Sequence, residues 1–168
     1  MKIIEKNIKE FKVEENANLL IEGCFDIFHD DHRKYIKKCI DAFKKDKGVY
    51  PTCLRVDIMS NIWTSKKGIY RPFLDEKTRE SQVYDFIKSF QNKIPMILTG
   101  ISSKASFEYS NFNEVKKIYP EYKIALCADN KEKIKAESFN FLEVSPLNTF
   151  HTSDIEKRLL SLKNISDN

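Results

Sequence analysis

The chain has 168 residues, of which 41% are hydrophobic, 12% aromatic and 32% charged, and these ordinary values exclude a disordered, collagen-like or membrane-spanning protein. Its length predicts one domain, residues 1–168, with a single core. Lysine and arginine number 29 against 25 acidic residues, and the net charge of +4 is too small and too evenly spread to indicate a nucleic-acid partner.

The apolar run Leu19–Phe25 predicts the first strand, and a lysine-rich helix is expected over about 31–45, where apolar side chains recur on one face. Cys53–Met59 predicts the second strand. A helix over about 75–90 follows, and Asp75 is its expected N-cap because a carboxylate accepts the free amides of a first helical turn.

Three further strands are expected in the second half of the chain, at Ile94–Thr99, Lys123–Cys127 and Phe139–Val144. Helices are expected near Asn113–Tyr119 and at Ser153–Leu162. Strands that alternate with helices indicate βαβ units. We therefore predict an α/β protein, Rossmann-like, in which a parallel sheet carries helices on both faces.

The four cysteines are far apart and form no CxxC pair, which indicates a reducing, cytoplasmic setting. The stretch 1–16 mixes lysine with glutamate and lacks the apolar run of a signal peptide. No apolar segment approaches the ~20 residues of a transmembrane helix, so no membrane partner is expected.

Ligands of parallel α/β sheets bind beyond the carboxyl ends of the strands. The segments expected there are 23–32, 60–71, 128–130 and 148–153, and all three histidines fall within them. In the first segment, His29 and His32 stand three residues apart at a helix start, beside free amides and the positive end of the helix dipole. Such a place suits a polyphosphate, although a chance pair is the structural alternative.

A zinc site at the two histidines is a second alternative. It lacks cysteine or carboxylate ligands in a known zinc spacing, so no metal ligand is predicted among the side chains.

The stretch Gly23–His32 resembles the signature G-x-FD-xx-HxGH of the nucleotidyltransferase superfamily, the cytidylyltransferase-like proteins. Ser60–Pro72, with Arg79 beyond it, resembles the NSD...KG-xx-RP...R segment of the sugar- and polyol-phosphate branch. Phe150–Arg158 resembles the IST(T/S)-x-I-xx-R motif, and Asp129 stands at the aspartate of a K-G-x-D element. These elements occur in the family's order over about residues 18–162.

The resemblance implies that a phosphorylated sugar or polyol attacks the α-phosphorus of CTP or ATP in line and that pyrophosphate leaves. Mg²⁺ is the implied cofactor, and a homodimer stays open as the assembly. The alternative function is a catalytically weakened nucleotide-binding protein of the same fold with a regulatory or assembly role.

By the same resemblance the candidate catalytic residues are His29, His32 and Lys67. The histidines would donate hydrogen bonds to the phosphates, whereas a solvated lysine pair is the alternative for Lys66 and Lys67. The candidate nucleotide-binding residues are Gly23, Cys24, Phe25, Asp26, Asp129, His151, Thr152 and Ser153.

Thr152 and Ser153 would offer hydroxyls and amides to the phosphates, and simple N-capping of the last helix is their structural alternative. Arg71 and Arg79 either bind the acceptor phosphate, which a guanidinium matches in geometry, or order the loop between them.

The chain departs from the family pattern most clearly at Asp31, which replaces the glycine between the two histidines. Glycine there lets a nucleotide approach the backbone, whereas aspartate adds bulk and a negative charge. We expect this change to weaken triphosphate binding, and the alternative is a carboxylate recruited to hold a magnesium ion or a basic acceptor. Other departures are Asn61 for the NSD aspartate, Cys127–Ala128 for K-G, Pro146 for an arginine, and His151 for the IST serine.

Overall fold

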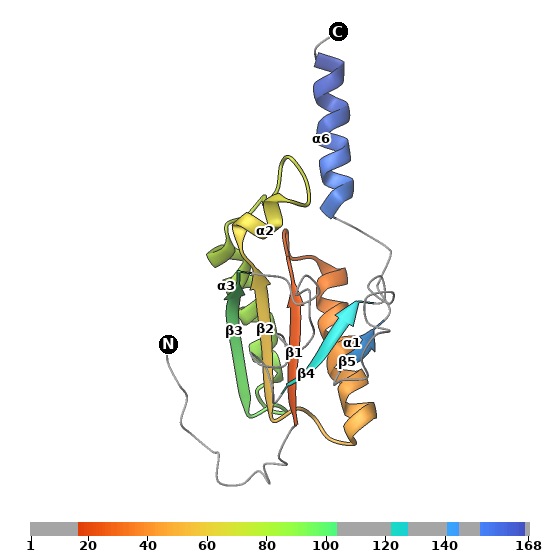
Figure 1. The fold of residues 1–168 in the computed structure, drawn as a ribbon, viewed down its shortest axis with the longest axis vertical. Coiled ribbons are helices and arrows are strands. Elements are labelled where there is room, and N and C mark those ends of the chain that lie inside the picture. Colours follow the sequence, from red (N-terminus) through yellow and green to blue (C-terminus); the bar gives the residue numbers. More distant parts are fainter. Residues whose placement is uncertain (1–16, 104–121, 128–140, 145–151, 167–168) are drawn as a thin grey trace.

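The computed structural model describes residues 17–103, 122–127, 141–144 and 152–166 (Figure 1). The first half holds β1, α1, β2 and the short helix α2, and α3 follows with its 3-10 extension η2. The second half adds three strands and α6. The bounds in chain order are β1 Asn18–Gly23, α1 Asp30–Lys47, β2 Cys53–Met59, α2 Asn61–Ser65, α3 Glu76–Ile87, η2 Lys88–Phe90, β3 Met96–Ser102, β4 Tyr122–Cys127, β5 Phe141–Val144 and α6 Thr152–Ser166.

The five strands in the described ranges form one parallel sheet in the order β3-β2-β1-β4-β5. The chain adds β2 and β3 on one side of β1 and then β4 and β5 on its other side, so the direction of strand addition reverses between β1 and β4. In open parallel sheets, ligands bind at such a reversal, beyond the carboxyl ends of the strands. The predicted α/β class with a parallel sheet is confirmed.

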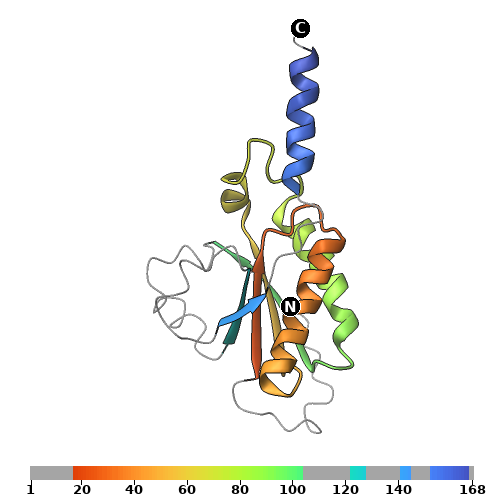
Figure 2. The same cartoon turned by 90° about the vertical axis from the view of Figure 1, so that its right-hand side faces the viewer.

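The two longer helices between the first three strands lie on the same face of the sheet (Figure 2). There α1 packs over β1 and β5, and α3 packs over β2 and β3. The helix expected near Asn113–Tyr119 lies outside the described residues. Helices on both faces of the sheet therefore stay a prediction. None of the helices in the described ranges combines the length and apolarity that a membrane crossing requires.

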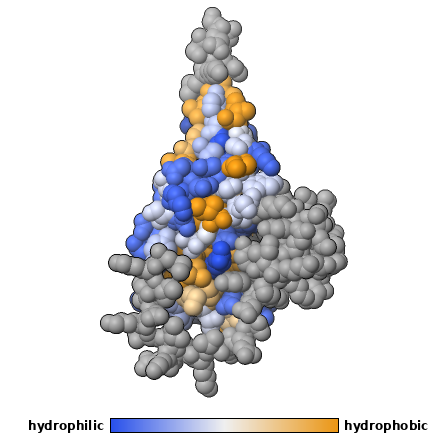
Figure 3. Space-filling model, turned by 60° about the vertical axis from the view of Figure 1, so that its left-hand side comes forward, coloured by the Kyte–Doolittle hydropathy of each residue, from blue (hydrophilic) through white to orange (hydrophobic). Residues whose placement is uncertain are grey.

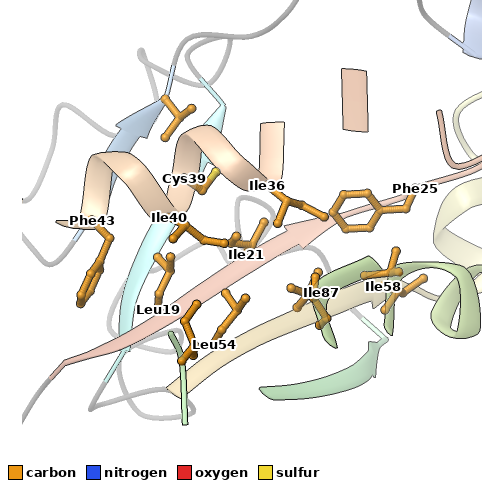
Figure 4. Close-up of a cluster of buried hydrophobic side chains, with 14 of the residues drawn as sticks. Leu19, Ile21, Phe25, Ile36, Cys39, Ile40, Phe43, Leu54, Ile58 and Ile87 are labelled. Atoms are coloured by element: carbon orange, nitrogen blue, oxygen red, sulfur yellow. The ribbon is translucent and has the colours of Figure 1, made fainter. Parts of the chain in front are cut away.

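The core lies between the sheet and these helices (Figure 4). Every second residue of a strand points to this face, and α1 contributes side chains at the three- and four-residue spacing of one helical face. The labelled core residues are Leu19, Ile21, Phe25, Ile36, Cys39, Ile40, Phe43, Leu54, Ile58 and Ile87, and all are buried. Each large aliphatic side chain buried here contributes about 1.5–3 kcal/mol. This packing fixes the N-terminus of α1 beyond the end of β1.

Sequence signals set several element boundaries. Asp75 is the N-cap of α3, as predicted, because its carboxylate accepts from the amides of Lys77 and Thr78 at 3.0 Å. The predicted strand Ile94–Thr99 is shifted to Met96–Ser102. Ile94 donates instead to the carbonyl of Phe90 at 2.9 Å and belongs to the turn before the strand.

The helix α6 begins beyond the carboxyl ends of the strands, near α2, and runs away from the sheet (Figures 1 and 2). On the face drawn in Figure 3, hydrophobic side chains reach the surface in small patches between hydrophilic ones. The largest exposed aliphatic side chains include Ile62 in α2 and Ile69 in the loop that follows it. Both α2 and this loop therefore lie at the surface, beyond the carboxyl ends of the strands.

Candidate functional site

The loop after β1 has a strained backbone. Phe25 and Ile27 have φ angles of 49° and 52°, in the left-handed region that non-glycine residues seldom adopt. The Phe25 ring folds back over Gly23, where an added Cβ would stand 2.8 Å from the ring. Such strain, about 1–3 kcal/mol per residue, persists only where the surrounding structure enforces it, and it occurs often at functional sites.

Asp26, between the two strained residues, holds this loop in place. Its side chain has 0% exposure, and both carboxylate oxygens accept from the Phe73 amide at 3.1 Å. The Leu74 amide donates to the same carboxylate at 3.1 Å, and the Thr152 hydroxyl donates to the Asp26 carbonyl at 2.9 Å. Asp26, predicted to bind nucleotide, thus directs its carboxylate to protein amides and ties three chain segments together.

The two histidines form a reciprocal cap at the start of α1. His29 Nδ1 accepts from the Asp31 amide at 3.3 Å, and His32 Nδ1 accepts from the His29 amide at 3.4 Å. A ring nitrogen that accepts a hydrogen bond carries no proton. Each imidazole therefore carries its proton on Nε2 at the positive end of the helix dipole, and the Nε2 atom of His29 is buried.

The His32 ring is packed between aromatic neighbours. Its centroid lies 3.9 Å from that of His29 and 5.9 Å from that of Phe28, and Phe25 meets it edge-on at 5.4 Å. Desolvation by this packing, together with the nearby His29 and Arg71, lowers the pKa of His32 from 6.5 to about 3. His32 is therefore neutral at physiological pH.

Arg71 joins the loop after α2 to both sides of the site. Its side chain is 9% exposed, with Nη1 3.8 Å from Asp26 Oδ2 and Nε 3.9 Å from Glu156 Oε2. The sequence left two roles open for Arg71, acceptor binding or loop ordering. These two carboxylate contacts match the ordering role.

Arg79 lies beneath the site with 0% exposure. Its Nη1 donates to the Cys24 carbonyl at 2.6 Å and to Thr64 Oγ1 at 3.2 Å. Nη2 donates to Asn61 Oδ1 at 2.9 Å, and Nε donates to the Leu74 carbonyl at 3.0 Å. Because the guanidinium has no exposed surface, the geometry supports the ordering role and gives no support to acceptor binding by Arg79.

Lys67 and Asp31 complete the described candidates. Lys67 is exposed on the loop after α2, and neighbouring Lys66 lies 3.7 Å above the Trp63 ring. Asp31 is 8% exposed and lies 3.8 Å from Lys34 Nζ within the first turns of α1. The carboxylate that replaces the family's glycine is thus buried beside the histidines.

The predicted meeting of the loop after β1 with the start of the last helix is confirmed by the Thr152–Asp26 hydrogen bond. Ser153 follows in α6 and is half-buried. Asp129 and His151 lie outside the described residues. Sequence reasoning missed Glu156, which occupies an unspecified position of the last motif and carries no local signal of its role.

No family model matches the chain, and no curated protein matches it. In the part of the chain that the structure describes, no group of three or more histidine, cysteine, aspartate or glutamate side chains could hold a metal ion. Two imidazole donors at a helix start, beyond the strand where the sheet order reverses, suit an anion such as a phosphate.

Proposed function

We propose that this protein is a nucleotidyltransferase, which moves a nucleotidyl group from CTP or ATP to a phosphorylated sugar or polyol and releases pyrophosphate. One observation carries the proposal. His29 and His32 stack at the start of α1 with both Nδ1 atoms accepting backbone amides, so that each ring is an Nε2–H donor. The pair stands beyond β1, where parallel sheets bind ligands.

In this proposal the protein positions its substrates and stabilises charge, and it forms no covalent intermediate. His29 and His32 donate to phosphate oxygens as negative charge builds on them during in-line attack. The low pKa of His32 keeps its ring neutral, so its donor role does not depend on titration near neutral pH. Lys67, exposed on the loop after α2, would supply a positive charge.

Mg²⁺ belongs to this proposal as the ion that neutralises triphosphate charge. It commonly binds through substrate phosphates and keeps several waters, so it needs few protein ligands. The N-terminus of α6, held beside Asp26 by Thr152, would add amide donors and a positive dipole end for the same phosphates.

A Rossmann-like arrangement with both faces covered is part of the proposal. The strand order β3-β2-β1-β4-β5 supports it, because strand addition reverses direction at β1, as it does in doubly wound parallel sheets. A cytoplasmic setting is also proposed, supported by the wide spacing of the four cysteines along the chain, which form no CxxC pair.

A second candidate function is a nucleotide-binding regulatory or assembly protein without transfer activity. The buried Asp31 carboxylate favours it, because a negative charge beside the histidines opposes a triphosphate. The contacts of Arg71 and Arg79 with protein groups favour it as well, since Arg79 has no exposed surface and the Arg71 side chain is only 9% exposed.

A thermal-shift screen against CTP, ATP, GTP and UTP with MgCl₂ separates the candidates, followed by a pyrophosphate-release assay with a panel of sugar and polyol phosphates. A ligand at 100 times its Kd adds about 2.7 kcal/mol of stability, which the melting temperature reports. Stabilisation by CTP or ATP with pyrophosphate release supports the transferase. Stabilisation without release supports the regulatory protein, and no stabilisation by any triphosphate refutes both.

A further inference from the structure

The loop that connects α2 to α3, residues 66–75, carries Lys67 and Arg71 past the site. Its last part is held by the Asp26 carboxylate, which accepts from the amides of Phe73 and Leu74. Its middle part reaches α6 instead. The proposed function leaves open what fixes that middle part.

Glu156, one turn into α6, makes the contacts in question. It is buried, and its Oε1 accepts from the Tyr70 amide at 3.2 Å. Its Oε2 lies 3.9 Å from Arg71 Nε. The carboxylate also packs directly on Gly68, where any Cβ would overlap it. One side chain of the last helix thus meets three residues of the loop.

Glu156 is one of two carboxylates that hold the Arg71 guanidinium in place. The guanidinium stands between Asp26 and Glu156, at 3.8 Å and 3.9 Å, beyond hydrogen-bond distance from both. Within the described ranges, its buried Nε has no hydrogen-bond partner. The position of Arg71 therefore depends on attraction from two sides, and loss of one carboxylate leaves only the pull toward the other.

We infer that Glu156 is a positioning residue that docks the 66–71 segment onto α6 and thereby sets Lys67 and Arg71 at the site. The docking follows from contacts alone. Its consequence for nucleotide binding rests on the proposed function.

Hydrogen exchange followed by mass spectrometry tests the docking directly, in the wild type, Glu156→Ala and Glu156→Gln. Glu156→Ala should speed exchange in peptides covering 66–73 by about tenfold or more, because a hydrogen bond to a buried charged acceptor is lost. Glu156→Gln should speed it less, since its amide oxygen can still accept from Tyr70. Peptides of α1 should be unchanged in all variants, which excludes global destabilisation.

Asp154→Asn is the matched control. It removes a negative charge from the same helix, but the Asp154 side chain is 52% exposed and pairs with Lys157 at 3.7 Å. Exchange over 66–73 in this variant should equal that of the wild type. Equal exchange in Glu156→Ala and Asp154→Asn would overturn the docking.

Calorimetric titration with MgCTP and MgATP then tests the consequence. If the wild type binds either one, Glu156→Ala should bind it at least about fivefold more weakly. Unchanged affinity in Glu156→Ala despite faster loop exchange would refute a role at the site. If the wild type binds neither triphosphate, the proposed function fails, and the exchange result alone decides the docking.

Discussion

The low pKa of His32 predicts a specific loss of stability in mild acid. The folded pKa is about 3 against an ordinary value of 6.5, so between these values the unfolded chain binds the proton and the folded chain does not. The neutral ring's contribution is therefore complete above pH 6.5. It is lost progressively as the pH falls from 6.5 toward 3.

The magnitude follows from the two pKa values. Between pH 7 and pH 5 the unfolded ring becomes almost fully protonated while the folded ring stays neutral, which removes about 2 kcal/mol from the free energy of unfolding. The physical cause is desolvation of the His32 ring, which is stacked on His29 and packed against Phe25 and Phe28.

Urea denaturation at pH 7 and pH 5 measures this loss, with His32→Gln as the comparison. Glutamine at the third position of a helix can accept the N-cap amide as His32 does, but it does not titrate. The loss between the two pH values should be about 2 kcal/mol smaller in His32→Gln than in the wild type. Equal losses in both proteins would refute the burial argument for His32.

Three other substitutions have expected outcomes. Arg79→Met should lower the free energy of unfolding by about 3–5 kcal/mol in urea titrations, because removal of the fully buried guanidinium leaves its protein acceptors unpaired. A loss under 1 kcal/mol would contradict the ordering role. Gly68→Ala should cost about 1–3 kcal/mol and speed exchange of the 66–73 loop, because its Cβ would displace the Glu156 carboxylate. Asp31→Gly should bind MgCTP or MgATP about fivefold more tightly by calorimetry. The substitution removes a buried negative charge that repels the triphosphate by about 1 kcal/mol. The matched control Asp30→Gly, whose side chain is 81% exposed, should not change affinity, and weaker binding by Asp31→Gly would indicate an acquired role for the carboxylate.

Local signals predicted much of the fold. Cys53–Met59 is a strand with the predicted bounds, and Asp75 caps its helix, because a short apolar run and a capping residue are both encoded in a few adjacent residues. Ile94 misled the prediction of β3, since burial of an apolar side chain does not require a strand. The short helix α2 was missed, although Ser60 before it is a recognisable N-cap residue.

The site was predictable in its location and less so in its contacts. His29 and His32 could be placed at a helix start from sequence alone. The burial of Arg79 could not, because its acceptor on Cys24 lies 55 positions away in the chain. Glu156 likewise acts on Tyr70 across 86 positions, and only the tertiary structure brings them together. Side-chain type identified candidates, whereas long-range packing determined their roles.

The rate of pyrophosphate release, with CTP or ATP and the preferred sugar or polyol phosphate, tests the central claim most directly. The wild type should release pyrophosphate only when triphosphate, acceptor and Mg²⁺ are all present. His29→Ala and His32→Ala should each lower the rate by about 10²–10³-fold, because each removes one donor to the phosphates in the transition state, while circular dichroism shows a folded protein. Wild-type rates in both variants, or no release by the wild type with any acceptor, would contradict the account.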